Sequence, residues 1–329
     1  MKNFDAEFTS LDHYIRVITQ RIWEERQIED IRKYYSDPCI VETPASVSTS
    51  VQAVIDGTQA TLAMFPDRRL LAEDVIQSGD EETGFLSSHR IISPMTHRGD
   101  GIFGKATGKK IHVRTIADCV CKDNRITHEW LVRDQGALAL QLGSTPQALA
   151  QQWLNERGAW SKAAAGAAPA YYHSHISTAS LAQNYAQALQ DYAVGKQKLE
   201  LVYDDAVHHL GPCGVSRYGH AEVGEYWSNL FKGLRPRNLK VEHLAFQSGA
   251  DRPDRVAIRW RAQCDAVSDV FSAYKPYKTS ASSSEFNSIK EIELMGINHA
   301  EFYRGRVLRE WVLIDEVALW MQILQVEVN

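Results

Sequence analysis

One segment that could carry proton-transfer chemistry occurs twice in this chain. Its copies are Arg125–Asp134 (RITHEWLVRD) and Arg306–Asp315 (RVLREWVLID), and both place a Glu-Trp pair in the middle of a predicted strand. Side chains alternate across a strand, so Glu129 and Glu310 point away from the tryptophan that follows each of them. The repeat also indicates two related folding units laid end to end.

The surroundings of the two glutamates decide what they can do. In an apolar cavity the charged form of a carboxylate is disfavoured, and the raised pKa lets it exchange protons with a carbon acid near neutral pH. Alternatively, each glutamate pairs with an arginine nearby, such as Arg90 or Arg259. The sequence favours these two interpretations equally.

Other polar residues of the first half are candidates for the same site. His89 lies in the strand-like run Ser87–Arg90 and could act as a proton shuttle or hydrogen-bond donor, or be an ordinary satisfied histidine. Tyr35, Glu42 and His97 are candidate groups at a pocket rim. The comparable candidates of the second half are Asn298, Glu310, His209 and His299.

Two residue types of the repeated segment have mainly structural interpretations. Trp130 and Trp311 are expected to pack at an interface between sheets, with lining a ligand as the less favoured alternative. Asp134 and Asp315 stand at the strand ends and are expected to cap the following helices.

The elements that position these residues follow from periodicity and turn residues. Apolar residues at helical spacing after Ser10 predict a first helix, and segments of β character separated by turns dominate from Leu70 onward. The predicted helices of the first half are 11–22, 28–35, 51–65 and 144–154, and its predicted strands are 39–43, 70–77, 84–92, 110–120 and 125–132. Helices followed by an antiparallel meander are typical of an α+β fold.

The length of 329 residues supports two domains, predicted at residues 1–157 and 173–329 with an Ala- and Gly-rich linker at 158–172. A Gln-Ser-Gly sequence begins at Gln77 and again at Gln247, and the Glu-Trp pair follows it at Glu129 and at Glu310. The spacing is 52 residues in the first half and 63 in the second, a difference of 11. We place the extra residues in Val267–Ser288, as a pocket lid or a disordered loop.

Composition excludes several classes of partner. A net charge of -5 without a basic cluster argues against nucleic acid. The first residues are too acidic for a signal peptide, and no segment is apolar enough to span a bilayer, so a soluble cytoplasmic protein is expected. Five cysteines without a Cys-x-x-Cys pair fit a reducing compartment.

Four motifs of the first half are Asp37–Pro44 (DPCIVETP), Thr107–Val113 (TGKKIHV), Lys122–Trp130 (KDNRITHEW) and Gln141–Gly143 (QLG). With the helices before them, they resemble the SnoaL-like polyketide cyclase branch of the NTF2-like superfamily, over most of residues 8–143 and more loosely over 178–323. The resemblance implies two cone-shaped domains, each a curved sheet around helices with a ligand pocket at its mouth, packed sheet to sheet as an intramolecular pseudo-dimer.

This chain departs from the family at the positions that carry chemistry. The acid/base aspartate of the family's cyclases falls on Leu131 and Val312, and their pocket histidine falls on Ala117 and Asn298. Polyketide cyclisation is therefore not carried over. Asp118 is costly to bury unpaired and either serves the site or forms a salt bridge across the sheet. Its strand parity, opposite the family's pocket face, favours the salt bridge.

Cofactor and metal motifs are not persuasive. Gly99–Gly104 spells G-x-G-x-x-G, but a Lys-rich strand follows it instead of the helix that a dinucleotide site needs. The histidines at 173, 175, 208 and 209 lack the companion acids or cysteines of a metal site. We therefore expect neither a cofactor nor a metal.

The sequence thus predicts cofactor-independent acid–base chemistry of an isomerase, lyase, hydratase or cyclase type. Its small-molecule ligand would be a partly apolar carbonyl or hydroxyl compound, with Glu129 as base and His89 as donor or orienter. The alternatives are a binding module without catalysis and a purely structural role for one half. A cavity with two convergent ionisable groups would favour the enzyme. Association into a homo-oligomer is left open.

Overall fold

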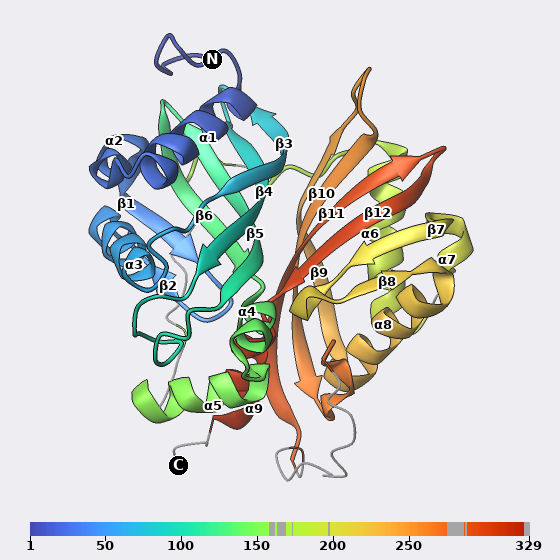
Figure 1. The fold of residues 1–329 in the computed structure, drawn as a ribbon. Helices are drawn as coiled ribbons and strands as arrows, with labels where there is room; N and C mark the ends of the chain where they lie inside the picture. The colour runs from blue at the N-terminus through green and yellow to red at the C-terminus, as the bar shows by residue number, and fades with distance from the viewer. Residues whose placement is uncertain are drawn as a thin grey trace. The chain divides into compact units, whose positions relative to one another are not determined.

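Two six-stranded sheets with the same strand order make up this chain (Figure 1). The computed structural model describes residues 1–157, 162, 169–172, 174–196, 198–274, 286 and 288–325. The strand orders are β2-β1-β6-β5-β4-β3 and β8-β7-β12-β11-β10-β9. In each sheet a meander of four antiparallel strands follows a helix, and its last strand pairs in parallel with the first long strand. The predicted α+β class and the internal repeat are confirmed, and the parallel pair is an addition that the sequence did not indicate.

The elements of the first half are α1 (Leu11–Thr19), η1 (Gln20–Glu24), η2 (Ile28–Asp30), α2 (Ile31–Tyr34), β1 (Tyr35–Glu42), β2 (Val47–Ser48), α3 (Val51–Met64), β3 (Leu71–Asp80), β4 (Gly84–Thr96), β5 (Lys110–Lys122), β6 (Arg125–Arg133), α4 (Gln135–Leu142) and α5 (Pro146–Arg157). The elements of the second half are α6 (Ser180–Ala193), α7 (Leu199–Val202), β7 (Tyr203–Leu210), η3 (Pro212–Gly214), β8 (Ser216–Tyr218), α8 (Gly219–Leu234), β9 (Pro236–Gln247), β10 (Asp254–Ala266), η4 (Asp269–Phe271), β11 (Lys290–Tyr303), β12 (Arg306–Ile314) and α9 (Glu316–Leu324).

Residue contacts divide the chain into two compact units. Met1–Arg133, Gln141–Ser144 and the described residues of 162–175 form the first unit, and the other described residues form the second. Helix α5 therefore groups with the second unit, where it packs against α9, although it precedes the predicted linker. Most of that linker, and residues 275–285 and 287 of the predicted lid, lie outside the described residues.

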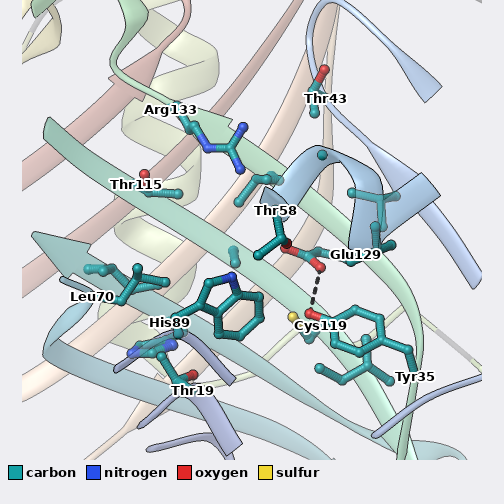
Figure 2. Close-up of a pocket in the computed structure, with 18 of the residues that line it drawn as sticks. Thr19, Tyr35, Thr43, Thr58, Leu70, His89, Thr115, Cys119, Glu129 and Arg133 are labelled. Atoms are coloured by element: carbon teal, nitrogen blue, oxygen red, sulfur yellow. Dashed lines mark hydrogen bonds between the residues drawn. The ribbon is translucent and has the colours of Figure 1, made fainter. Parts of the chain in front are cut away.

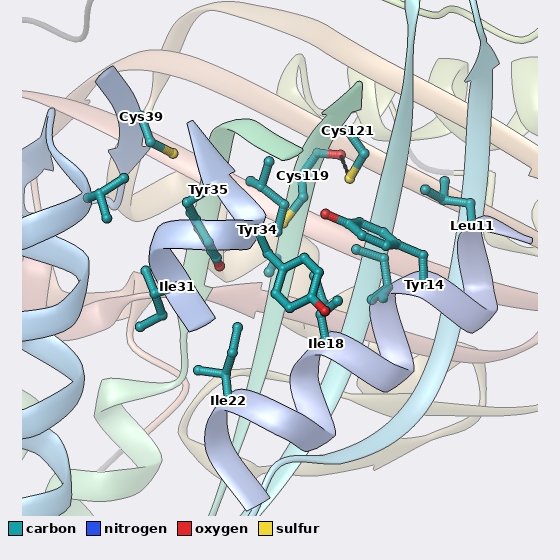
Figure 3. Close-up of a cluster of buried hydrophobic side chains, with 14 of the residues drawn as sticks. Leu11, Tyr14, Ile18, Ile22, Ile31, Tyr34, Tyr35, Cys39, Cys119 and Cys121 are labelled. Carbon is teal, nitrogen blue, oxygen red and sulfur yellow. Dashed lines mark hydrogen bonds between the residues drawn. The ribbon is translucent and has the colours of Figure 1, made fainter. Parts of the chain in front are cut away.

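The first helix forms where its apolar spacing predicts it. The Ser10 hydroxyl accepts a hydrogen bond from the backbone N–H of His13 at 3.1 Å and caps α1. Its apolar face, including Tyr14 and Ile18, is buried against the inner face of the sheet (Figure 3). A single π-helical segment, Gln20–Glu24, continues α1.

Buried cysteines complete this core without pairing. Cys39, Cys119 and Cys121 belong to the cluster that α1 and α2 cover in Figure 3. All five cysteines of the chain are buried and free. They act as small apolar residues, as expected from their spacing.

The aspartates that end the two repeated strands cap the helices that follow. Asp134 Oδ1 accepts from the Ala137 N–H at 2.9 Å, and Asp315 Oδ1 accepts from the Ala318 N–H at 3.1 Å. Both capping predictions are confirmed. Among the described residues, no helix combines the length and the apolar character needed to cross a membrane.

Glu316, the residue after the second of these caps, makes the stability of the second unit depend on pH. Its carboxylate accepts hydrogen bonds from Ser272 Oγ and the Ala273 N–H, both at 2.6 Å, but burial raises its pKa to about 7. The folded state thus holds this proton more tightly than the unfolded state. The resulting stabilisation is complete below the ordinary pKa of 4.5 and is lost as the pH rises through about 7.

Glu316→Gln should remove this loss. The change in unfolding free energy between pH 5 and pH 8 is expected to shrink by roughly 2 kcal/mol relative to the unmodified protein. Urea unfolding at several pH values measures it, with exposed Glu200→Gln as the matched control. An unchanged pH dependence in Glu316→Gln would contradict the burial argument.

Candidate functional site

A cavity of about 300 Å³ lies inside the first unit, between the helices and the inner face of the sheet (Figure 2). Much of its wall is apolar, with Ile18, Trp23, Leu70 and Leu131 among the lining residues. The ionisable side chains in the wall are Tyr35, Arg68, His89, Cys119, Glu129 and Arg133. The volume is at the small end of the roughly 300–1,000 Å³ typical of ligand pockets, so it suits a small molecule.

Glu129 is the acid of this cavity. Its side chain is 7% exposed, and its Oε2 accepts a hydrogen bond from the Tyr35 hydroxyl at 3.2 Å (Figure 2). Burial raises the pKa of Glu129, and the positive charge of Arg133 and the Tyr35 hydrogen bond offset only part of that rise. The carboxyl therefore keeps its proton to a higher pH than an exposed glutamate does.

The strand register explains why Glu129 faces inward. On β6 it stands opposite Cys119 of β5 and beside Val41 of β1. Leu131 and Ala117 form the next inward pair, and both line the cavity. The alternative pairing of Glu129 with Arg90 is not observed, because Arg90 forms an ion pair with Glu73 at 3.1 Å.

His89 reaches the cavity from β4, where it stands opposite Ala117. It is 3% exposed, and its buried Nε2 has no hydrogen-bond partner among the described residues. Burial, with the positive charges of Arg16 and Arg90, lowers the pKa of His89 to about 3. The ring is neutral at physiological pH, which suits a hydrogen-bonding role better than a proton shuttle through the imidazolium.

Sequence reasoning missed the two arginines of the cavity. Arg133 ends β6 on the same face as Glu129 and Leu131, so strand parity could have found it. Arg68 lies in the loop between α3 and β3, where no periodicity marks which residue turns inward.

Two predicted residues of the sheet do not reach the cavity. Asp118 lies on the opposite face of β5, fully buried, and its Oδ1 accepts from Ser88 Oγ at 2.5 Å. Of the two predicted roles, this placement rules out that Asp118 serves the site as a catalytic residue. Trp130 shares that face and stacks on His128, with ring centroids 3.9 Å apart, so it packs rather than lines the pocket.

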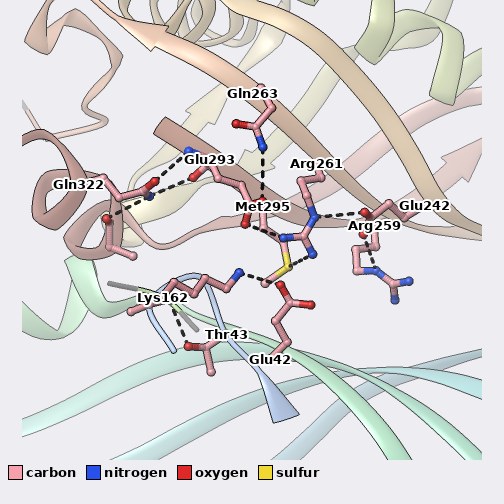
Figure 4. A network of polar contacts seen from close by, with 12 residues as sticks. Glu42, Thr43, Lys162, Glu242, Arg259, Arg261, Gln263, Glu293, Met295 and Gln322 are labelled. Carbon is pink, nitrogen blue, oxygen red and sulfur yellow. Dashed lines mark hydrogen bonds and ion pairs between the residues drawn. The ribbon is translucent and has the colours of Figure 1, made fainter. Parts of the chain in front are cut away.

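Two predicted rim residues also lie elsewhere. The Glu42 carboxylate forms an ion pair with Lys162 Nζ at 2.6 Å (Figure 4). The His97 ring lies 3.3 Å from Thr107 Oγ1 and packs against Phe65. Neither residue is part of the cavity wall, although both lie on segments next to it. Of the predicted set in the first half, the structure brings together Glu129, His89 and Tyr35 only.

In the second unit the matching glutamate is held in a closed network of hydrogen bonds. Glu310 is fully buried, and its Oε1 accepts from the hydroxyls of Tyr185 (2.5 Å) and Tyr203 (2.8 Å). His209 Nδ1 lies 2.6 Å from Oε2, and Asn298 Nδ2 donates to the Tyr185 hydroxyl at 3.1 Å. Glu310 and Asn298 thus form hydrogen bonds with buried side chains around them instead of facing a cavity that could hold a ligand.

Large side chains occupy the interior that is hollow in the first unit. Thr58 lines the first cavity and lies 23 residues after the start of β1. The residue 23 positions after the start of β7 is Tyr226, so a tyrosine takes the place of this threonine in the second unit. The inward pair Ile91 and Thr115 is replaced by Trp260 and Gly296. A Cβ on Gly296 would lie 2.4 Å from the Trp260 ring, so only glycine admits the ring there.

Arg259, the other predicted partner of a glutamate, is buried and pairs with Glu242 at 3.3 Å, in a network that also contains Arg261 (Figure 4). A second cavity, of about 420 Å³, includes Arg217 and Tyr226 in its wall but neither Glu310 nor Asn298. In the part of the chain that the structure describes, no group of three or more His, Cys, Asp or Glu residues could hold a metal ion.

Sequence comparison matches most of the first unit to a known family. The sequence model of the SnoaL-like polyketide cyclases matches residues 14–142, which contain the whole first sheet and every residue of its cavity. Residues 14–142 form a SnoaL-like domain. The second unit repeats its strand order, so the chain carries two domains of one topology, as the tandem NTF2-like prediction requires.

Several solved structures are similar to part of this chain. A SnoaL-like polyketide cyclase from Agrobacterium tumefaciens is 17% identical, covers 41% of this chain and all of its own, and has a TM-score of 0.34. TsrD from Streptomyces laurentii is 16% identical over 43% of this chain and 99% of its own, with a TM-score of 0.37. IdmH from Streptomyces antibioticus is 20% identical over 39% and 95%, with a TM-score of 0.34. No curated protein matches this chain.

Proposed function

We propose that the SnoaL-like domain is a cofactor-independent acid–base enzyme that moves a proton on a small, partly apolar carbonyl or hydroxyl compound. The observation that carries this proposal is the buried Glu129 carboxyl with its raised pKa in the wall of a 300 Å³ cavity. General acid–base catalysis is most effective when the pKa of the catalytic group is near the working pH.

Tyr35 prepares one oxygen of this carboxyl. Burial raises the pKa of Tyr35 well above its usual value, so its hydroxyl stays protonated and donates to Glu129 Oε2. No hydrogen bond within the described residues occupies Oε1. This oxygen can take the proton from a carbon next to a carbonyl, and the electron pair of the broken C–H bond moves onto the carbonyl oxygen as an enolate. Return of the same proton to another carbon of the enolate completes an isomerisation. In a dehydration, the enolate electron pair expels a hydroxyl from the neighbouring carbon, and this hydroxyl takes the proton from Glu129 and leaves as water.

His89 suits the other side of this reaction. As a neutral imidazole in the wall of the cavity, it can form a hydrogen bond to a substrate oxygen. A neutral donor stabilises a developing enolate without first giving up a proton. His89 is therefore assigned to binding the oxygen, and Glu129 to moving the proton.

We propose that the second domain has a structural role and no catalytic one. Its glutamate already has three hydrogen-bond partners, and aromatic side chains occupy the matching interior. A binding module without catalysis is less well supported for the first domain, because a cavity that only holds an apolar ligand has no need for a buried acid.

Deuterium exchange tests the proposal even while the substrate is unidentified. The protein is incubated in D₂O with a panel of small carbonyl and hydroxyl compounds, and mass spectrometry detects C–H to C–D exchange or a changed product. At least one compound should exchange with the unmodified protein and not with Glu129→Gln. Saturable binding of a compound without exchange or turnover would support the binding module instead.

A further inference from the structure

Arg68 is a buried cation without a counter-ion of its own. Its side chain is 7% exposed and lines the cavity of the SnoaL-like domain. Among the described residues, no hydrogen bond or ion pair engages its guanidinium group, and only its backbone takes part in hydrogen bonds. The negative charge of Glu24 raises the pKa of Arg68, but the Glu24 carboxylate forms its ion pair with Arg69 Nε, at 2.8 Å.

Such an arrangement is costly for a residue that serves the fold alone. A buried charge without a partner loses its hydration and gains nothing in return. Burial, together with the positive charges of Arg133 and Arg26, lowers the pKa of Arg68 to about 9. At neutral pH the group still carries its charge, so this desolvation is not relieved by loss of the proton.

The charges of the cavity wall do not cancel. Arg133 lines the same space, and its charge acts on both Arg68 and Glu129. His89 is neutral, and burial disfavours the ionised form of Glu129. The cavity therefore carries net positive charge whether Glu129 is protonated or not, and it attracts an anion.

We infer that this cavity recognises an organic carboxylate, with the planar guanidinium of Arg68 binding the carboxylate group and the apolar wall holding the remainder of the molecule. An arginine fork matches both oxygens of a carboxylate, which gives orientation as well as charge. Carboxylate binding by Arg68 does not depend on the proposed function. The substrate class does, because Glu129 would act on a carbon of the molecule that Arg68 binds. The substrate class becomes a small carbonyl- or hydroxyl-bearing acid.

A matched pair of probes tests this inference directly. Binding of 3-phenylpropanoate and 3-phenylpropanamide, which differ only in the charged group, is measured by calorimetry. The carboxylate should bind at least about tenfold more tightly than the amide. Arg68→Met should abolish that preference and leave the affinity for the amide unchanged. Arg98→Met, the same substitution on an exposed side chain of the first unit outside the cavity wall, is the control and should keep the preference.

Two further measurements keep the outcome decisive. Arg68→Met should raise the Tm, because it removes an unpaired buried charge, whereas a structural arginine would lower it. Inorganic phosphate should compete with 3-phenylpropanoate only weakly, since it lacks an apolar part. Equal affinity for carboxylate and amide, no binding of the carboxylate, a lowered Tm in Arg68→Met, or equally strong competition by phosphate would each overturn the inference. Glu129→Gln should retain the carboxylate preference, so a failure of the proposed proton transfer is recognised separately.

Discussion

Glu129→Gln is expected to lower turnover by about 10²–10⁴-fold while the protein stays folded. Glutamine has the same shape and can still accept the hydrogen bond from Tyr35, but it cannot take a proton. Because the substitution also removes a carboxyl whose charged form is disfavoured by burial, the Tm should be unchanged or slightly higher. Steady-state kinetics on a compound found by deuterium exchange, together with thermal unfolding, measures both effects.

The pH profile provides a second, independent readout of the same residue. Activity that needs the ionised carboxylate should fall as the pH drops through a pKa above the ordinary 4.5 of glutamate. Arg133→Met should move this acidic limb to higher pH, because the positive charge of Arg133 favours the ionised form. Exposed Glu82→Gln is the matched control and should change neither kcat nor the limb. Full turnover in Glu129→Gln, or an acidic limb that Arg133→Met leaves in place, would show that another group is the base.

The parts of this structure that sequence could predict are those encoded by local periodicity. Apolar residues every three or four positions predicted the buried face of α1, and alternation along β6 put Glu129 and Trp130 on opposite faces. Alternation alone left open which face lines the cavity, and the structure shows that it is the face of Glu129. The same parity put Asp118 on the face opposite the pocket, which the structure confirms, and the partner described there is the Ser88 hydroxyl, so the favoured salt bridge stays a prediction. Alternation also puts Arg133 on the same face of β6 as Glu129.

Long-range packing decided what sequence could not predict. Arg68 turns inward from a loop, where neither strand nor helix periodicity applies. The sequences around Glu129 and Glu310 are similar, yet Glu129 faces a cavity and Glu310 faces a hydrogen-bond network. The difference arises because Tyr226 and Trp260, from elements far away in sequence, fill the interior of the second unit. Substitutions at these distant positions, rather than the repeated motif, separate the two domains.

Glu310→Ala is expected to destabilise the second domain by about 3–5 kcal/mol, the second large effect that follows from this difference. The substitution leaves the hydroxyls of Tyr185 and Tyr203 and the ring of His209 buried without their common acceptor. Glu129→Ala is the matched control, because there only the Tyr35 hydroxyl loses its acceptor and a disfavoured carboxyl is removed, so its cost should be much smaller. Urea unfolding of both variants measures the contrast. Below the unfolding transition Glu310→Ala should retain turnover, since its site takes no part in the proposed chemistry. Equal costs for the two substitutions would contradict the network argument. Loss of turnover in a folded Glu310→Ala protein would assign the acid–base role to the second domain or to both.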